Sequence, residues 1–264
     1  MRIRSLRMEA VSFWYGRTQI LQNANLHFNS GEITAILGPS GSGKSTLIKC
    51  LSTVLKPGEG KITANGKNLW DDLNAFRLQL GYVPQDDVIH RQLKVEDALY
   101  YSGRLRLRNF DQGSVLSARI DTVLAGLGLE ERRYLRVRSL SGGQRKRVNI
   151  GVELLSDPQV LVLDEPASGL DPAIEEDLVK LLRRMADAGR NIILTTHSME
   201  RLNDYNKLIL VAAGRVMYAG PPDKLAEHFE VKDPSDVYRA LRDRSLDEWE
   251  SRYRSSTYAV EEES

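Results

Sequence analysis

The stretch GPSGSGKST, residues 38–46, has the residue types and spacing of a phosphate-binding loop, G-x-x-x-x-G-K-[S/T]. Its glycines let backbone amides turn inward around phosphates, and Lys44 supplies a point charge to the β and γ phosphates. Ser45 offers a hydroxyl to Mg²⁺, and the helix that starts here adds its positive end. The loop lies between an apolar run and a helix-like stretch, which favours nucleotide binding over a structural glycine turn. We therefore expect the whole loop to contact nucleotide: Gly38, Pro39, Ser40, Gly41, Ser42, Gly43, Lys44, Ser45 and Thr46.

VLVLDEP, residues 160–166, is an apolar run that ends in two carboxylates. Asp164 can bind Mg²⁺ directly or through water, and Glu165 can orient and activate an attacking water as a general base. Taken alone, a strand that ends in Asp-Glu is a weak signal, because helix caps have a similar composition. With a phosphate-binding loop in the same chain, the pair predicts hydrolysis of a phosphate bond.

LSGGQ, residues 140–144, adds a second element suited to an anion. Ser141 can donate a hydroxyl hydrogen bond, and Gly142 and Gly143 permit close approach of the backbone at a helix start. A plain serine-capped helix would explain the serine but not the two glycines and the glutamine. A complete phosphate-binding loop needs no second element, so we expect this one to serve nucleotide held by a partner.

The order of these motifs resembles that of the ATP-binding cassette (ABC) ATPases over about residues 5–230. The resemblance implies a P-loop NTPase (RecA-like) core that binds ATP and Mg²⁺ and hydrolyses ATP. It also implies a head-to-tail dimer, in which LSGGQ of one subunit closes over the γ-phosphate held by the phosphate-binding loop of the other. The motifs that carry the resemblance are the loop 38–46, GYVPQ 81–85, LSGGQ 140–144, VLVLDEP 160–166, SGLD 168–171 and His197 after ILTT.

Further positions take their expected roles from the resemblance. Gln85 resembles the glutamine that touches Mg²⁺ and the attacking water and senses a transmembrane partner, although a surface glutamine remains an alternative. His197 resembles the histidine that holds the γ-phosphate, and Asp171 would both cap a helix and contact the other subunit. The resemblance thus implies Lys44, Gln85, Glu165 and His197 as catalytic residues, Ser45, Gln85 and Asp164 as metal ligands, and Ser141, Gly142, Gly143, Gln144 and Asp171 as contacts to nucleotide.

Tyr15 lies where the family places an aromatic side chain that stacks on adenine. Phe13 and Trp14 are adjacent, so packing of this aromatic group in the core is the alternative.

Four apolar runs indicate the elements that must position these residues. None alternates polar with apolar residues, which predicts strands covered on both faces, as in a parallel sheet between helices. Residues 171–189 read as a helix, because Asp171 is a good N-cap, Pro172 suits the first turn and Gly189 ends the apolar stripe. The runs are ITAIL 33–37, VLVL 160–163, NIILTT 191–196 and KLILVA 207–212.

Other parts of the chain have different patterns. The first sixty or so residues form short strand-like pieces with Gly and Asn turns, which predicts an antiparallel β layer. Residues 94–135 are mostly helical in pattern, and from about residue 231 the composition suggests short helices followed by a linker or frayed tail. We expect a nucleotide-binding domain over 1–230, with an inserted helical subdomain at about 86–155, and a helical or linker tail over 231–264.

The 264 residues carry a net charge of +1, which gives no reason to expect nucleic-acid binding. Cys50 is the only cysteine, so no disulfide can form within the chain and a reducing compartment is expected. No apolar run approaches the roughly 18 residues that a membrane-spanning helix needs. Arg145, Lys146 and Arg147 could raise the potential near phosphate, but we favour a solvated helix face.

A transporter subunit is the favoured member of the family, because the chain has one cassette and no sustained heptads. The resemblance is strongest to the G (white-type) group and its bacterial relatives, which implies an exporter of lipid or other hydrophobic compounds. Gln144 and THSME, residues 196–200, depart from the eukaryotic members of that group. Expected partners are a second nucleotide-binding domain, in a homodimer, and a transmembrane domain, fused or separate, at the cytoplasmic face of the plasma or inner membrane. The alternative is a soluble ABC ATPase that acts on nucleic acid or ribosomes.

Overall fold

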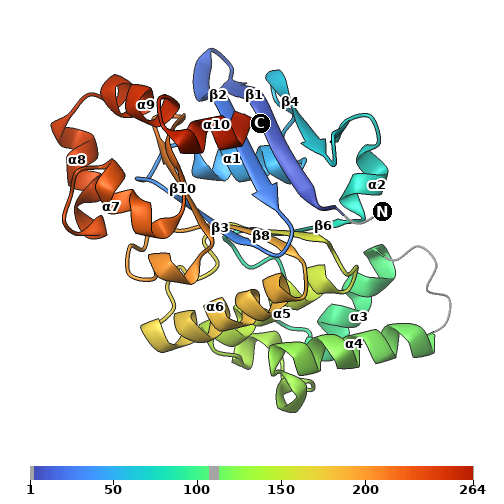
Figure 1. Ribbon diagram of the computed structural model, residues 1–264. Helices are drawn as coiled ribbons and strands as arrows, with labels where there is room; N and C mark the ends of the chain where they lie inside the picture. Colours follow the sequence, from blue (N-terminus) through green and yellow to red (C-terminus); the bar gives the residue numbers. More distant parts are fainter. Residues whose placement is uncertain (1–2, 107–112, 264) are drawn as a thin grey trace.

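Two β-sheets with flanking helices make up the structure, a computed structural model that describes residues 3–106 and 113–263 (Figure 1). The larger sheet has the strand order β10-β9-β3-β8-β7-β6, and its strands run in parallel except β10, which is antiparallel to β9. Its strands are β3 (Ile33–Leu37), β6 (Leu80–Val83), β7 (Val160–Leu163), β8 (Asn191–Thr195), β9 (Lys207–Ala212) and β10 (Arg215–Gly220).

The four apolar runs of the sequence are the four inner strands of this sheet, which confirms the prediction. The two edge strands, β6 and β10, were not singled out. Both are less uniformly apolar, since β6 contains Gly81 and β10 begins with Arg215. An edge strand pairs with one neighbour instead of two, so it tolerates polar residues and glycine better than an inner strand does.

The antiparallel layer at the N-terminus is also confirmed. It is a sheet of order β2-β1-β4-β5, and a tight turn containing Gly16, at φ 60°, joins β1 to β2. The elements of this part are β1 (Ser5–Tyr15), β2 (Thr18–Asn29), β4 (Glu59–Ala64), β5 (Lys67–Asn68), α1 (Lys44–Leu51) and α2 (Leu73–Arg77).

The helical pattern of the middle of the chain corresponds to packed helices. Arg133 joins two of them, since its guanidinium forms ion pairs with Glu96 of α3 at 2.6 Å and Asp121 of α4 at 2.5 Å. Helix α6 begins as expected, with the Asp171 carboxylate accepting from the backbone N–H groups of Ala173 and Ile174. The helices are α3 (Val95–Arg106), α4 (Gly113–Leu127), α5 (Gly142–Leu154) and α6 (Pro172–Asp187).

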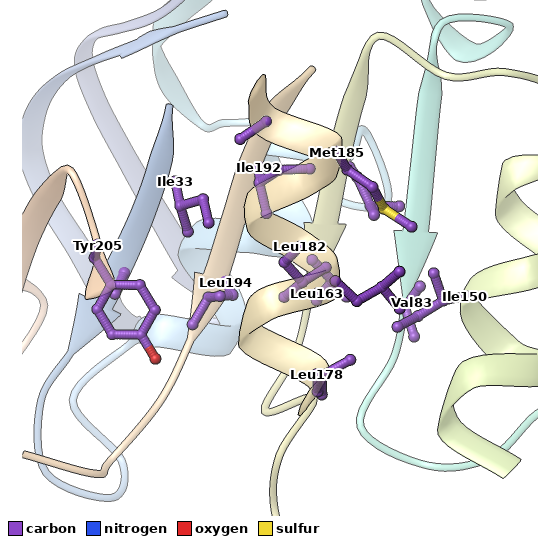
Figure 2. Close-up of a cluster of buried hydrophobic side chains, with 14 of the residues drawn as sticks. Ile33, Val83, Ile150, Leu163, Leu178, Leu182, Met185, Ile192, Leu194 and Tyr205 are labelled. Carbon is purple, nitrogen blue, oxygen red and sulfur yellow. The ribbon is translucent and has the colours of Figure 1, made fainter. Parts of the chain in front are cut away.

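The larger sheet has a different layer of structure on each face (Figure 1). Successive residues of β7 point to opposite sides: Leu161 and Leu163 pack with helices α3–α6, whereas Val160 and Val162 pack with α1 and the antiparallel sheet. Figure 2 shows Leu163 beneath the apolar stripe of α6. The continuous apolar sequence of the strand follows from this double coverage.

The short helices expected in the C-terminal segment are present, but the linker or frayed tail expected after them is not seen in the described residues, which are helical up to Glu263. These helices pack on the rest of the chain, because Trp249 is 2% exposed and its ring lies 4.9 Å from that of Phe229. The Glu262 carboxylate accepts a hydrogen bond from the backbone N–H of His27 at 2.6 Å and pairs with the Lys207 ammonium. The helices are α7 (Leu225–His228), α8 (Val237–Asp243), α9 (Leu246–Arg254) and α10 (Thr257–Glu263).

Among the helices that the structure describes, none combines the length and apolar composition that a membrane-spanning segment requires.

Candidate active site

The phosphate-binding loop connects β3 to α1 and is pressed between two strands. A Cβ on Gly38, whose φ is 150°, would lie 2.1 Å from the carbonyl oxygen of Val211 in β9. A Cβ on Gly43, at φ 105°, would lie 3.0 Å from the carbonyl oxygen of Ile20 in β2. Glycine is therefore required at both positions, because the φ angle is positive and because the neighbouring strand leaves too little room for a Cβ atom.

The ammonium group of Lys44 folds back onto the phosphate-binding loop. Its ammonium donates hydrogen bonds to the carbonyl oxygens of Gly38 at 2.8 Å and Pro39 at 2.9 Å. Burial lowers the pKa of Lys44, and the nearby carboxylates of Glu165 and Asp164 oppose that shift. Helix α1 has no acidic residue in its first turn and no side-chain cap, so its first N–H groups can face an anion.

Asp164 lies beside Ser45 at the carboxyl end of β7. Its Oδ1 atom accepts hydrogen bonds from the hydroxyl of Ser45 at 3.3 Å and the hydroxyl of Thr195 at 2.8 Å. A carboxylate and a hydroxyl at this separation are the hard oxygen ligands that Mg²⁺ prefers. The described residues contain no group of three or more His, Cys, Asp or Glu side chains that could hold a metal, so Mg²⁺ here would also need the oxygens of nucleotide and water.

Glu165 has a backbone conformation that a non-glycine residue rarely adopts, with φ 43°. Its N–H donates to the Thr195 hydroxyl at 2.8 Å, and its Oε2 accepts from the Gln85 amide at 3.3 Å. The ring nitrogen Nδ1 of His197 lies 3.8 Å from the same oxygen. The structure thus brings together four residues that the sequence analysis placed in the site: Gln85, Asp164, Glu165 and His197.

Thr195 was not identified from the sequence as a site residue. It is fully buried, and one hydroxyl both accepts from the N–H of Glu165 and donates to the carboxylate of Asp164. The sequence held a signal for this residue, because Thr195 lies in the run NIILTT that directly precedes His197.

A pocket of about 510 Å³ lies beside Glu165 and His197, and Ser235 and Tyr238 of the C-terminal segment contribute to its wall. The Tyr238 hydroxyl oxygen accepts a hydrogen bond from the N–H of Gly38 at 3.3 Å. Burial raises the pKa of Tyr238, so its hydroxyl stays protonated. The C-terminal segment therefore contacts the phosphate-binding loop, which sequence analysis did not anticipate.

The aromatic residues at the end of β1 divide between core and surface. Phe13 is buried, and its ring centroid lies 4.9 Å from that of Tyr15, which is 51% exposed. The ring of Trp14 packs closely over Gly58. Core packing is thus supplied by Phe13, and the exposed ring of Tyr15 is available for stacking, a role that stays a prediction.

Ser141 caps helix α5 through a reciprocal pair of hydrogen bonds. Its hydroxyl accepts from the N–H of Gln144 at 3.2 Å, and its own N–H donates to the Gln144 amide oxygen at 3.0 Å. Ser141 and Gly142 are exposed, whereas a Cβ on Gly143 would lie 2.3 Å from the Ile174 side chain of α6. The second glycine is thus explained by packing of the two helices, and the first remains free to approach an anion.

The interpretation of Arg145, Lys146 and Arg147 as a solvated helix face is wrong. Lys146 is 7% exposed, and its ammonium contacts the loop that contains Gln85. Arg147 donates to the carbonyl oxygen of Leu127 at 3.3 Å and pairs with Asp177 at 3.4 Å. Helix α5 packs between other helices and the sheet, so neighbouring elements cover most of its surface.

A scan against family models matches residues 21–168, more than half of the chain, to the ABC transporter family. An ABC transporter ATP-binding/permease protein of Mycobacterium tuberculosis is 37% identical over 86% of this chain and 26% of its own length. ABC transporter G family member 28 of Arabidopsis thaliana is 39% identical over 75% of this chain and 19% of its own length. A broad substrate specificity ATP-binding cassette transporter of Rattus norvegicus is 37% identical over 80% of this chain and 33% of its own length. The chain thus spans about a fifth to a third of these relatives.

Solved structures share the fold over nearly the whole chain. One, described as part of an ABC transporter complex from Clostridium perfringens, has a TM-score of 0.77 and 30% identity, and covers 94% of this chain and 97% of its own. Another, an ATP-binding subunit of an ABC transporter, has a TM-score of 0.76 and 26% identity, and covers 90% of this chain and 99% of its own. With these neighbours, the mixed sheet, the antiparallel sheet and the flanking helices of this chain are those of a P-loop NTPase.

Proposed function

This chain belongs to the ABC transporter family, whose ATP-binding domains hydrolyse ATP, and we propose that it works as one half of a head-to-tail dimer with two ATP molecules at the seam. Each ATP would lie between the phosphate-binding loop of one chain and Ser141 and Gly142 of the other. The dimer would be coupled to a transmembrane domain, fused to the chain or separate, at the cytoplasmic face of the membrane.

One observation carries the proposal of a dimer: the two elements that we propose to contact nucleotide lead into helices in opposite layers of the same chain. The phosphate-binding loop leads into α1, which packs on one face of the larger sheet, whereas Ser141 begins α5, which packs on the other. Exposed Ser141 and Gly142, with a helix N-terminus behind them, can complete a phosphate site on a second copy.

The hydrolytic residues have complementary roles in this proposal. Lys44 and the first N–H groups of α1 bind the phosphates, while Ser45 and Asp164 would hold Mg²⁺, which would neutralise charge on the phosphate oxygens. Glu165 takes the proton of the attacking water as general base, and its fixed backbone keeps the carboxylate beside Gln85. Closure of the dimer excludes other water and places the attacking water in line with the γ-phosphate.

His197 and Asp171 complete the proposed site from its exposed side. The side chain of His197 is 67% exposed and faces Glu165, so its ring can still turn to the γ-phosphate. Asp171 caps α6 and is exposed, which leaves its second carboxylate oxygen for a contact across the dimer.

Export of lipid or other hydrophobic compounds is the transport function that we propose. It rests on the resemblance of the chain to the white-type group and on its sequence identity to G family members. One of the relatives is named a broad substrate specificity transporter.

Substitution of the general base tests the dimer. Glu165→Gln should lower kcat for ATP hydrolysis by about 10²–10⁴-fold, the usual contribution of a general base, and leave ATP binding intact. With ATP and Mg²⁺ it should therefore accumulate as a dimer in sedimentation or light-scattering measurements. The double variant Glu165→Gln/Gly142→Asp, which adds a carboxylate to the seam, should remain monomeric. Monomers of Glu165→Gln at saturating ATP would contradict the proposal.

A further inference from the structure

One face of helix α5 lies along strand β6 and the loop that contains Gln85. Three polar side chains of that face, Lys146, Asn149 and Glu153, follow at intervals of three and four residues, the spacing of one helix face. Each is at most 7% exposed. Buried polar groups of this kind persist when their hydrogen bonds are satisfied, and here most partners lie between residues 82 and 88.

Lys146 binds two successive peptide units, one on each side of the Cα atom of Gln85. Its ammonium donates hydrogen bonds to the carbonyl oxygens of Pro84 and Gln85, each at 3.1 Å. Burial lowers the pKa of Lys146, and the carboxylates of Asp87, Asp164 and Asp86 oppose that shift. A charged donor makes the stronger kind of hydrogen bond to a carbonyl oxygen, so this contact fixes the local backbone.

The other two residues fix the ends of the same segment. The Asn149 amide donates to the Asp87 carboxylate at 2.7 Å and accepts from the N–H of Val88 at 3.4 Å. The Glu153 carboxylate accepts from the N–H of Tyr82 at 3.2 Å and is held by the Arg106 guanidinium of α3 at 2.6 Å. The backbone around Gln85 is therefore bound to α5 from β6 to the far side of the loop.

The side chain of Gln85 reaches away from this contact to the general base. Its amide donates to Oε2 of Glu165 at 3.3 Å, while the backbone carbonyl oxygen of Gln85 accepts from the Lys146 ammonium. A shift of the two peptide units that flank Gln85 would move its side-chain amide relative to Glu165, and a misplacement of about 1 Å at a reacting group can cost two orders of magnitude in rate.

We propose that Lys146 is a positioning residue for hydrolysis, which holds the backbone of Gln85 so that its amide lies against Glu165. The inference deepens the proposed function and rests on it. Lys146 follows Ser141 by five residues, a rise of about 7.5 Å on one rigid helix. Seating of Ser141 and Gly142 on the partner's ATP would thus set the position of Gln85 in the same chain, and the two sites of the dimer would be linked through α5.

A double-mutant cycle with Gln85 tests this role. Lys146→Met removes the ammonium and keeps an unbranched side chain, and it should lower kcat roughly tenfold with little change in the Kd for a fluorescent ATP analogue. Gln85→Ala should lower kcat by a similar factor. The double variant should be no slower than the slower single variant, because both changes remove the same interaction. Arg147→Met, a matched change at the next residue of α5, should keep the kcat of the unchanged chain.

Hydrogen exchange of the loop gives a measurement that does not depend on turnover or on the dimer. Amides of residues 85–88 should exchange about tenfold faster in Lys146→Met, and Arg147→Met should leave them unchanged. Lys146→Gln, which replaces the ammonium with a neutral NH₂ donor, should give an exchange rate between the two and serves if the methionine variant does not fold.

Two outcomes would overturn the inference: loop exchange unaltered in Lys146→Met, or rate losses that multiply in the double variant. Neither depends on whether Glu165→Gln dimerises with ATP. Failure of that variant to dimerise would instead count against the proposed dimer, and the exchange measurement would still decide whether Lys146 holds the loop.

Discussion

Thr195 connects two carboxylate residues of the candidate site through a single hydroxyl. It bridges the backbone of Glu165 and the side chain of Asp164 from a fully buried position at the end of β8. Glu165 needs such support, because its φ of 43° is unfavourable for a residue with a side chain. The proposed general base, Glu165, and the proposed metal ligand, Asp164, are thus positioned by the same atom.

Thr195→Val keeps the shape of this side chain and removes both hydrogen bonds. The N–H of Glu165 and one oxygen of Asp164 lose a buried partner, at a cost of about 1–3 kcal/mol each in stability. We expect a lower kcat with a smaller change in the KM for ATP, measured by steady-state ATPase assays, together with a lower denaturation midpoint. Thr195→Ser keeps the hydroxyl and should retain most of the activity. Equal kcat in the valine and serine variants would contradict this role.

Residues within continuous motifs could be proposed for the site from the sequence, and residues that act through distant contacts could not. The types and spacing of Lys44, Ser45, Asp164 and Glu165 indicate a chemical role for each, and these roles stay predictions. Lys146 looks like part of an ordinary basic run until the fold places two carbonyl oxygens beside it. A partner that is distant in sequence leaves no local pattern.

At the scale of elements, the apolar runs and the caps of α6 were sufficient to place the inner strands and that helix, because burial on both faces and helix ends have local signatures. The C-terminal helices could not be placed in this way. Their sequence is charged, and their packing depends on a few large side chains, such as Trp249 and Tyr253, that contact distant elements.

Buried His228 makes the C-terminal packing sensitive to pH. Burial lowers its pKa from 6.5 to about 4, although its ring nitrogen Nε2 bonds the carbonyl oxygen of Met217 at 3.0 Å. The unfolded chain therefore binds more protons between pH 6.5 and 4, and the free energy of unfolding falls as the pH drops through that window. At pH 5 this histidine lowers the free energy of unfolding by about 1–2 kcal/mol relative to neutral pH.

His228→Phe keeps an aromatic ring beside Phe229 and Trp249 and cannot be protonated. Urea unfolding at pH 7.5 and 5 should show a smaller loss of stability on acidification than in the unchanged chain. His90→Gln alters an exposed histidine and is the control. A loss on acidification as large in His228→Phe as in the control would rule out this source of pH dependence.

Tyr238 connects helix α8 to the phosphate-binding loop. Tyr238→Phe removes the acceptor for the N–H of Gly38 and keeps the ring in the pocket wall. We expect the stability to fall by about 1 kcal/mol, and the Kd for ATP to rise a few-fold because the first glycine of the loop is less firmly placed. Isothermal titration with ATP and thermal unfolding measure the two effects. An unchanged Kd would show that α8 supports the fold without influencing the loop.

At the scale of the whole molecule, the sheet separates what the proposed reaction must bring together. Lys44 and Glu165 lie on elements at its carboxyl end, and the exposed turn at Ser141 begins a helix of the opposite layer from α1. If a working site takes the phosphate-binding loop from one chain and the Ser141 turn from the other, a chain defective in one of these elements should be complemented by a chain in which that element is intact.

Mixing two inactive chains tests this composite site. Lys44→Met disables the phosphate-binding loop, and Gly142→Asp brings a carboxylate against the partner's phosphate while Ser141 still caps α5. In a dimer of one chain of each kind, one site has both defects and the other has neither. An equal mixture should therefore hold intact sites at about a quarter of the total, since half of randomly paired dimers are mixed. ATP hydrolysis should rise on mixing well above that of either chain alone. If each chain instead hydrolysed ATP with its own residues, both variants would stay defective and the mixture would equal the mean of the two.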